Sequence, residues 1–213
     1  MNHKLKISII KYNAGNVQSV IFALNRLGIE PILTNDPEEI KSSDKIIFPG
    51  VGEASSCMRH LKDTGLDVLI PTLKQPVLGI CVGMQLMCNY SEENDTQGLG
   101  IFDIDVLKFT INKSPSPLER GWGEAEALKV PQMGWNTIYD LKTDLFRNIR
   151  ENSYIYYVHS YAAGLGKDTV ATTNYFSEYS AALQKNNFYA VQFHAEKSSK
   201  TGGLILENFI KHC

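Results

Sequence analysis

A cysteine between two glycines is the residue of this sequence best placed to act as a nucleophile. The segment Gly79-Ile80-Cys81-Val82-Gly83 lies between a strand-like and a helix-like run. Small flanking residues permit the tight turn that lifts a nucleophile clear of a sheet. A helix N-terminus favours a thiolate, and the Val82 N–H would face an oxyanion on the attacked carbon. From these five residues alone, a buried cysteine in an ordinary turn is an equal alternative.

A nucleophilic cysteine needs a base, and His194 is the candidate. It ends an apolar run at residues 189–193, and Glu196 follows two positions later. In an extended segment, residues i and i+2 face the same side, so both side chains should point toward one site. A carboxylate beside an imidazole fixes its tautomer and stabilises the imidazolium. Taken alone, the pair is more often a strand end with a solvated acid. With Cys81 it forms a Cys-His-Glu set.

The segment Pro49-Gly50-Val51-Gly52 ends another strand-like run. Ligands bind beyond the carboxyl ends of parallel strands, so this turn and the cysteine turn should share one edge of a sheet. Its glycines permit close backbone approach. An amide of this turn would then be a second oxyanion donor. Val51 is the candidate, because the glycines on both sides make its peptide easy to reorient. A plain strand-to-helix turn is the alternative.

Hydrophobic patterning predicts the elements that position these residues. Strands are expected at residues 7–10, 32–33, 45–48 and 76–80, and helices at 16–27, 36–39, 54–61 and 84–90. This alternation is typical of a parallel sheet covered on both faces. The second half is richer in strands, expected at residues 105–111, 154–161, 169–174, 181–184 and 188–193, before a helix at 204–210. A polar, turn-rich segment at 113–123 is predicted to be an exposed loop.

Length and composition exclude several classes of protein. The 213 residues fit a single domain, expected over 1–213. A net charge of −2 argues against a protein that holds nucleic acid by bulk charge. The longest apolar run, around residues 77–84, is far shorter than the roughly 20 residues of a membrane span. The N-terminal run is too short for a secretory signal. Four cysteines without a C-x-x-C pair argue for free thiols in a reducing compartment, and we expect the cytoplasm.

Five motifs occur in order along the chain: Pro-Gly-Val-Gly at 49–52, Gly-Ile-Cys-Val-Gly-Met-Gln at 79–85, Val-Pro-Gln-Met-Gly-Trp-Asn at 130–136, Val-His-Ser-Tyr at 158–161 and Gln-Phe-His-Ala-Glu-Lys-Ser at 192–198. Together they resemble class I glutamine amidotransferases, in particular the glutaminase subunits of imidazole glycerol phosphate synthase. Met84 favours that group, because the related anthranilate, guanylate and carbamoyl-phosphate amidotransferases usually carry His there. The resemblance covers essentially the whole chain. It implies a flavodoxin-like, three-layer α/β fold with a central, mostly parallel sheet and a nucleophile elbow.

The resemblance also implies roles for individual residues. Cys81 would be the nucleophile, His194 the general base and acid, and Glu196 the residue that orients it. Glutamine would be contacted by Gly52, Gln85, Glu93, His159, Ser160 and Tyr161. A synthase partner would be faced by Met133, Trp135, Asn136 and Lys197. For Glu93 a solvated acid, and for Trp135 ordinary core packing, remain alternatives. The resemblance implies neither a metal nor an organic cofactor.

The implied reaction is hydrolysis of L-glutamine to L-glutamate and ammonia. The ammonia would pass to a (β/α)₈-barrel cyclase in a heterodimer, which makes imidazole glycerol phosphate and an aminoimidazole carboxamide ribotide in histidine biosynthesis. We expect the liganded partner to gate the oxyanion hole by reorienting the peptide at Val51. One alternative is the same chemistry feeding another acceptor, such as an enzyme that amidates a surface sugar. Another is a catalytically silent interaction subunit, and a stand-alone cysteine peptidase is a distant third.

The sequence departs from the family pattern at three places. Gln132 stands where the family usually has His, and Ala195 replaces the usual Pro between the catalytic His and Glu. Because proline stiffens the backbone, Ala195 is expected to leave the His–Glu pair less pre-organised. The loop at 114–127 is longer and more polar than is typical of the family. None of these changes removes a member of the Cys-His-Glu set.

Overall fold

The structure, a computed structural model, describes residues 5–12, 17–110 and 129–213. Its central sheet has the strand order β11-β12-β13-β4-β3-β1-β2. The parallel part comprises β1 (Ile7–Ile10), β2 (Ile32–Thr34), β3 (Lys45–Phe48), β4 (Val77–Ile80) and β13 (Phe188–Val191). Two antiparallel strands, β12 (Glu178–Lys185) and β11 (Thr169–Asn174), extend it at one edge. The predicted mostly parallel sheet is confirmed, and the parallel strands follow the flavodoxin order.

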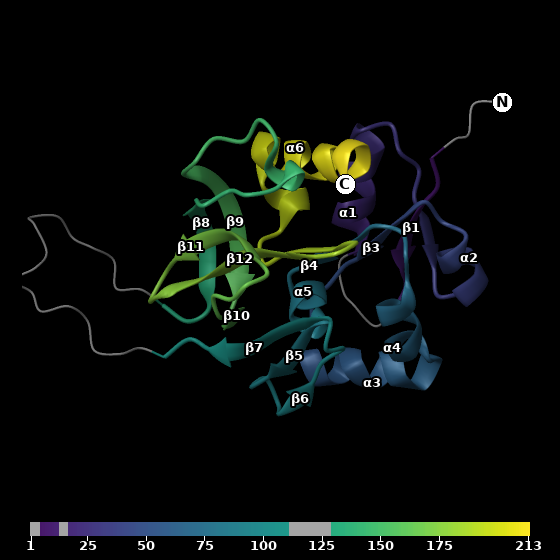
Figure 1. The fold of residues 1–213 in the computed structure, drawn as a ribbon, viewed down its shortest axis with the longest axis horizontal. Helices are drawn as coiled ribbons and strands as arrows, with labels where there is room; N and C mark the ends of the chain where they lie inside the picture. The colour runs from purple at the N-terminus through teal and green to yellow at the C-terminus, as the bar shows by residue number, and fades with distance from the viewer. Residues whose placement is uncertain (1–4, 13–16, 111–128) are drawn as a thin grey trace, which may run out of the picture.

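Helices cover both faces of this sheet, which gives the three layers expected (Figure 1). On one face lie α1 (Val17–Arg26) and α6 (Ser199–His212), and on the other α3 (Ala54–Thr64), α4 (Leu66–Leu69) and α5 (Val82–Met87). The short α2 (Pro37–Lys41) is capped by the side chain of Asp36. Glu53 caps α3 in the same way, and Gly65 ends that helix with a left-handed conformation.

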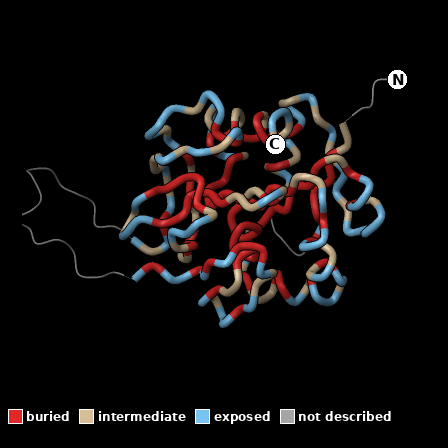
Figure 2. Tube along the Cα trace, in the orientation of Figure 1, coloured by how far each residue is buried: buried red, intermediate tan, exposed pale blue. Residues whose placement is uncertain are grey.

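The core lies between the sheet and its helices, because the parallel strands are covered on both sides. Every residue of β1, β3 and β4 is buried, as expected for strands that face helices on both faces. Figure 2 shows these buried stretches running through the middle of the molecule. Strand β7 instead alternates buried and exposed residues along most of its length, the pattern of a sheet with one face toward solvent.

Two smaller sheets build the second half. One has the order β10-β7-β5-β6 and the other pairs β8 with β9. Their strands are β5 (Cys88–Ser91), β6 (Thr96–Gln97), β7 (Phe102–Lys108), β8 (Gln132–Ile138), β9 (Ser153–His159) and β10 (Tyr161–Ala163). Three short 3₁₀ turns, η1 (Ile70–Thr72), η3 (Asp144–Phe146) and η4 (Ala195–Lys197), complete the described elements. The end of β9 and the start of β10 form one wall of the candidate site, and β8 pairs with β9 behind it.

The structure corrects several predicted boundaries. The helix expected at 84–90 runs over α5 and ends at Met87, because the next residues pair with β7 as strand β5. The strand expected at 154–161 is divided at Ser160 into β9 and β10, which belong to different sheets. The predicted loop at 113–123 and the cap at Asn16 lie outside the described residues. Within the described part of the chain, no helix is long and apolar enough to cross a bilayer.

Candidate active site

Cys81 occupies the junction between β4 and α5, and its backbone is strained. Its φ is +53° with ψ −112°, a combination that side chains other than glycine rarely adopt and that clusters at functional sites. The Cys81 N–H donates to the Val191 carbonyl at 2.8 Å, which ties the turn to β13. The side chain is 3% exposed. This is the sharp strand-to-helix turn of a nucleophile elbow, as the sequence predicts.

The turn at 49–52 is pressed against this elbow. A Cβ added to Gly50 would lie 2.2 Å from the Gly83 nitrogen, and one added to Gly83 would lie 2.2 Å from the Phe48 carbonyl oxygen. Both distances are shorter than any real contact, so two glycines are needed for the backbones to touch here. Gly52 has a φ of +135°, again a conformation suited to glycine. The turn at 49–52 and the cysteine turn therefore lie side by side at one edge of the sheet, as predicted.

His194 and Glu196 form a buried pair behind the thiol. The His194 Nδ1 lies 2.9 Å from the Glu196 Oε1, and both side chains are 3% exposed. The segment is not extended, contrary to the prediction: residues 195–197 form the 3₁₀ turn η4. The two side chains meet because that turn folds back, not because i and i+2 share a strand face. Ser198 anchors the turn by donating to the His194 carbonyl at 2.7 Å.

The electrostatics of His194 favour the charged ring. Burial lowers its pKa, but hydrogen bonds to the Cys81 sulfur and the Glu196 carboxylate outweigh this and raise the pKa to about 10. The imidazole is therefore protonated at neutral pH and lies beside a sulfur. Such a cation next to a thiol stabilises the thiolate, which is the nucleophilic form. The arrangement can support attack on a carbonyl carbon followed by proton transfer.

A cavity of about 360 Å³ opens over Cys81. Its lining comprises Val51, Gly52, Cys81, Val82, Gln85, Glu93, Pro131, Val158, His159, Ser160, Tyr161, His194 and Lys197. The cavity therefore brings together both predicted oxyanion donors and all six residues expected to contact glutamine. Glu196 stands behind His194, outside the lining. The size falls in the ordinary range for small-molecule sites.

Polar contacts that the sequence analysis did not assign surround the nucleophile. The Gln192 side-chain amide donates to the Cys81 sulfur at 3.9 Å, and the Cys81 thiol lies 3.8 Å from the Val158 carbonyl. Gln85 donates to the Tyr161 carbonyl at 2.9 Å and to the Gln192 side chain at 3.1 Å. Gln192 precedes His194 by two residues in the sequence. That spacing is the one feature of the sequence that could have predicted a contact of Gln192 with the site.

Glu93 is not a freely solvated acid. It is half-buried, lines the cavity and accepts a hydrogen bond from the Ala54 N–H at 2.8 Å, at the N-terminus of α3. Burial raises its pKa, the Ala54 hydrogen bond lowers it, and the charge of Glu53 raises it further. One oxygen of the carboxyl group is thus fixed by the helix, and the group faces the cavity.

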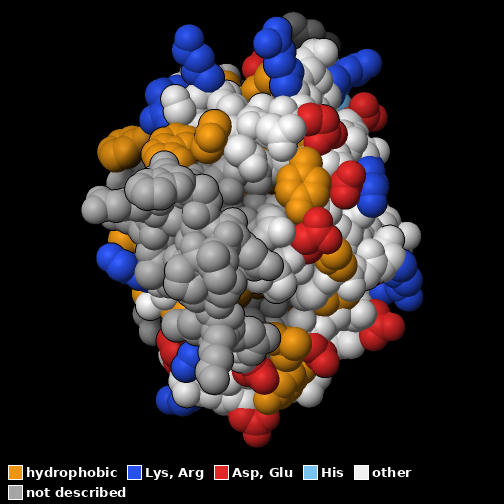
Figure 3. All heavy atoms as spheres, turned by 90° about the vertical axis from the view of Figure 1, so that its left-hand side faces the viewer, with side chains coloured by type: hydrophobic (Ala, Val, Ile, Leu, Met, Phe, Trp, Pro, Cys, Tyr) orange, Lys and Arg blue, Asp and Glu red, His pale blue; other side chains and the backbone are white. Residues whose placement is uncertain are grey.

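Of the four residues expected to face a partner, Met133, Trp135 and Lys197 are exposed and Asn136 is half-buried. Met133 is 65% and Trp135 52% exposed, so Trp135 is not core packing; it stacks edge-on against Tyr156. Asn136 donates to the Asn174 carbonyl, and Lys197 is exposed at the cavity rim. Figure 3 faces this end of the molecule and shows hydrophobic side chains among charged ones. Within the described residues, no group of three or more His, Cys, Asp or Glu side chains could hold a metal ion.

The fold and the site define a class of protein, and sequence comparison agrees. The family model for class I glutamine amidotransferases matches residues 8–213. Solved structures with this fold include a putative GMP synthase protein from Thermoplasma acidophilum, with a TM-score of 0.72 at 21% identity, covering 99% of this chain and 94% of that one. PurLQS from Thermotoga maritima gives a TM-score of 0.64 at 14% identity, covering 99% of both chains. The chain belongs to the class I glutamine amidotransferases.

Curated relatives narrow this class further. The imidazole glycerol phosphate synthase subunit HisH of Bacteroides fragilis is 51% identical over 97% of this chain and 100% of its own length. The HisH of Pasteurella multocida is 44% identical, and HisH 2 of Campylobacter jejuni 40%, each covering 97% of this chain and 98% of the relative. The resemblance seen in the motifs therefore extends along the whole sequence, to the HisH group of the family.

Proposed function

We propose that this protein hydrolyses L-glutamine to L-glutamate and supplies the ammonia to a cyclase partner in histidine biosynthesis. The observation that carries the proposal is the cavity over Cys81, where a strained cysteine, a charged histidine and two backbone turns meet. The HisH relatives support the pathway. The four cysteines, all among the described residues, form no disulfide, which agrees with a reducing location such as the cytoplasm.

In the proposed mechanism, the Cys81 thiolate attacks the side-chain amide carbon of glutamine. The carbonyl oxygen gains negative charge and is stabilised by the Val82 N–H, which follows the nucleophile at the start of α5. The second donor would be the amide of Val51 once its peptide is reoriented, and the close contact between Gly50 and Gly83 brings this turn next to the elbow. The His194 imidazolium then donates its proton to the leaving nitrogen, and ammonia departs from a γ-glutamyl thioester.

The second half-reaction uses the same residues in reverse. His194, now neutral, takes a proton from water as the water attacks the thioester carbon. The oxyanion forms again in the same position and collapses to release glutamate and the Cys81 thiolate. Glu196 keeps the Nδ1 side of the ring occupied through its 2.9 Å hydrogen bond, so that Nε2 faces the reacting groups throughout.

Glutamine would be held by both walls of the cavity. The Glu93 carboxylate is the group suited to the substrate α-ammonium, because it is half-buried and one of its oxygens is fixed by α3. Gln85 and the backbone of residues 159–161 form the opposite wall. Gly52 lies at the rim, where its backbone is exposed to the cavity and could contact the substrate.

The partner in this proposal is a cyclase subunit with a (β/α)₈ barrel, bound as a heterodimer. Ammonia is mostly protonated near neutral pH, so a closed passage between subunits would keep it reactive. Met133 and Trp135 offer the exposed hydrophobic contacts that such an interface needs. Lys197, at the rim of the cavity, and Asn136 would add polar contacts to the partner in this proposal. The liganded partner would activate the enzyme by reorienting the Val51 peptide.

The test is glutamate release from glutamine by the purified chain, with and without the cyclase and its nucleotide ligand. We expect strong stimulation by the liganded partner and loss of turnover in Cys81→Ala. Cys57→Ala is the matched control, because Cys57 is a buried thiol of α3 outside the cavity lining. Steady turnover without stimulation would point to another acceptor enzyme. Absence of turnover in every combination would favour a silent subunit.

A further inference from the structure

A chain of buried hydrogen bonds connects the strand with the exposed Trp135 to the wall of the glutamine cavity. It passes from the Gln132 side chain on β8 to the Tyr179 hydroxyl on β12, then to His159 at the end of β9. His159 in turn contacts the Tyr161 carbonyl, which accepts from Gln85. We call these five groups the polar relay. Gln132, Tyr179, His159 and Gln85 are 2%, 3%, 7% and 3% exposed.

Counting protons gives the polar relay a direction. The Tyr161 carbonyl only accepts, so the His159 Nδ1, 2.8 Å away, must carry a proton. Burial lowers the pKa of His159 to about 4, against the opposing effect of that hydrogen bond, so the ring is neutral and has a single N–H. Its Nε2 is then an acceptor, and the Tyr179 hydroxyl 3.0 Å away must donate to it.

The proton of Tyr179 is thereby used, which fixes the orientation of Gln132. The Gln132 Oε1 lies 2.7 Å from the Tyr179 hydroxyl, and its amide nitrogen has no partner among the described residues. Two acceptors cannot share a contact, so the amide group must turn its NH₂ toward Tyr179. Gln132 then donates to Tyr179, Tyr179 to His159 and His159 to Tyr161. Every hydrogen bond in this direction has one donor and one acceptor.

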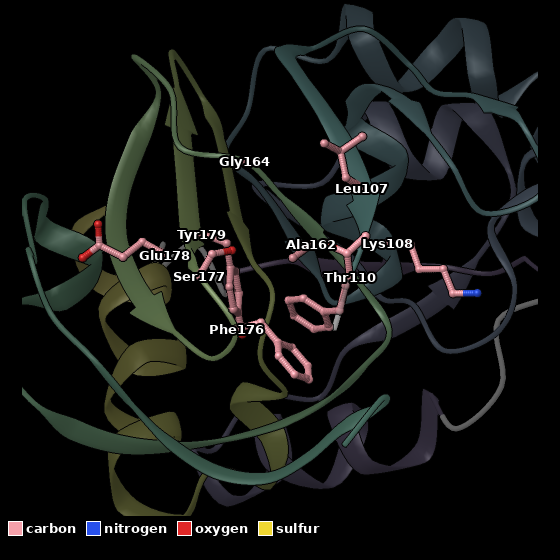
Figure 4. A pocket seen from close by; sticks show the side chains of 10 residues that line it. Leu107, Lys108, Thr110, Ala162, Gly164, Phe176, Ser177, Glu178 and Tyr179 are labelled. Carbon is pink, nitrogen blue, oxygen red and sulfur yellow. The ribbon is translucent and has the colours of Figure 1, made fainter. Parts of the chain in front are cut away.

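Tyr179 stands between two cavities. It lines a second cavity of about 210 Å³, whose walls include Lys108 at the end of β7 and Phe176 before β12 (Figure 4). On its other side the hydroxyl reaches His159, which lines the cavity over Cys81. Phe109 packs against both rings, at 5.5 Å from Tyr179 and 5.2 Å from His159. Packing therefore fixes the Tyr179 ring, and the hydroxyl alone makes the polar link.

We propose that Tyr179 is a positioning residue for glutamine. Its hydroxyl holds His159, which in turn holds the Tyr161 carbonyl, so that Gln85 keeps its position in the substrate wall. Gln132 links this wall to β8. This inference rests on the proposed glutaminase function. The polar relay lies beneath the surface that carries Trp135. A partner bound to β8 can therefore alter the affinity for glutamine through it. The sequence alone gives no indication of it, because a tyrosine and a glutamine are common in strands.

The test compares Tyr179→Phe with Tyr139→Phe in the full chain bound to its cyclase. Tyr139 donates to Glu178, the neighbour of Tyr179, so its variant disturbs the same strand outside the polar relay. Loss of the Tyr179 hydroxyl leaves the buried His159 Nε2 without a donor. We expect the KM for glutamine to rise about tenfold in Tyr179→Phe, with kcat within about twofold. Tyr139→Phe should leave both unchanged.

Two further measurements keep the inference open to refutation if Tyr179→Phe folds poorly. Gln132→Met keeps the shape of the side chain and should raise the KM by about threefold, and the double variant should be no worse than Tyr179→Phe alone. Nitrogen NMR of histidine-labelled protein should show His159 neutral and protonated at Nδ1. A His159 protonated at Nε2 at neutral pH, or equal KM values for Tyr179→Phe and Tyr139→Phe in an active complex, would overturn the inference. An inactive wild-type complex would instead overturn the proposed function itself.

Discussion

The two sides of the cavity over Cys81 are held in place by different forces. On the side of the central sheet, Gly50 and Gly83 bring two backbones into contact, and fully buried strands lie directly beneath them. On the opposite side, β9 pairs with β8 through a backbone ladder, and the wall formed by β9 and β10 is tied to β12 by a side-chain hydrogen bond between His159 and Tyr179. A steric contact of this kind admits one arrangement, whereas a side-chain hydrogen bond can be replaced by another at small cost provided that no buried group is left without a partner. The backbone around Cys81 is therefore built rigidly, and the parts able to respond to a partner are the Val51 peptide, which lies beyond this contact, and the substrate wall.

The largest effect is expected from Glu196→Gln on the rigid side. The substitution keeps the size of a side chain that is 3% exposed but removes the charge that orients and stabilises the His194 imidazolium. We expect kcat to fall by about 10²–10⁴-fold, with little change in the KM for glutamine. Glu207→Gln on α6 is the control, since Glu207 is an exposed partner of Lys211. A loss no greater than that of the control would show that Glu196 does not orient His194.

Alkylation of the four thiols as a function of pH tests whether Cys81 is the one that reacts near neutral pH. Burial raises the pKa of both Cys57 and Cys213 to about 11, and it raises that of Cys88 as well. A raised thiol pKa means less thiolate at neutral pH, about tenfold less for each pH unit below the pKa. Iodoacetamide at pH 7–8 should therefore modify Cys81, while Cys57 and Cys213 react only as the pH approaches 11.

Peptide mass spectrometry of the alkylated chain gives the readout, and Cys81→Ala provides the control. In that variant, modification near neutral pH should be lost without transfer to another thiol. Rapid labelling of Cys57 at pH 7 would contradict the burial of α3 against the sheet. Slow labelling of Cys81 would show that the elbow does not present its thiol to the cavity.

A smaller effect, on stability, is expected from Gly83→Ala. The new Cβ would lie 2.2 Å from the Phe48 carbonyl oxygen, so the elbow and the end of β3 must separate. Overpacking of this kind lowers the free energy of unfolding by about 1–3 kcal/mol. Gly203→Ala is the matched control, because its Cβ meets no described atom within 4 Å and α6 should gain roughly 0.5–1 kcal/mol in helix propensity. Urea unfolding measures both variants, and changes of the same sign would refute the steric argument.

The rigid side is also the side that the sequence predicted well. The turn around Cys81 is local, so the five adjacent residues 79–83 are enough to predict it. His194 and Glu196 were paired correctly but for the wrong reason, because the 3₁₀ turn at 195–197 depends on packing against α6 rather than on residue pattern. Glutamine contacts came from family resemblance, and the structure gathers them around one cavity. Their individual roles remain predictions.

The other side was predicted less well, for a physical reason. Strand β5 was read as helix because Cys88 continues an apolar run without a breaker, and only pairing with β7 ends the helix. The link between Gln132 and Tyr179 joins residues 47 positions apart in different sheets. Rules based on residue spacing apply only to residues that are close in sequence. They therefore cannot predict hydrogen bonds between side chains of distant strands.

The smallest effect on the isolated chain is expected from Trp135→Ala. Because the isolated chain should be almost unchanged, any effect of this variant in the complex reports on partner binding next to the substrate wall. Trp135 is 52% exposed and touches Tyr156 edge-on, so its loss should change the free energy of unfolding by less than about 0.5 kcal/mol. Basal glutamine turnover should be unchanged. In the complex, however, an exposed aromatic ring at an interface is often worth about 2 kcal/mol or more, so cyclase affinity should fall by about thirtyfold.

Val68→Ala on α4 controls for the loss of an exposed apolar side chain, since Val68 is 71% exposed and helix α4 lies at the opposite end of the molecule from β8 (Figure 1). Titration of glutaminase activity with the cyclase separates the two variants. If Trp135→Ala weakens stimulation and Val68→Ala does not, the surface above the polar relay is where the partner acts. If Trp135→Ala lowers basal turnover of the isolated chain instead, the substrate wall depends on that ring even without a partner. The division into a rigid and a responsive side would then be wrong.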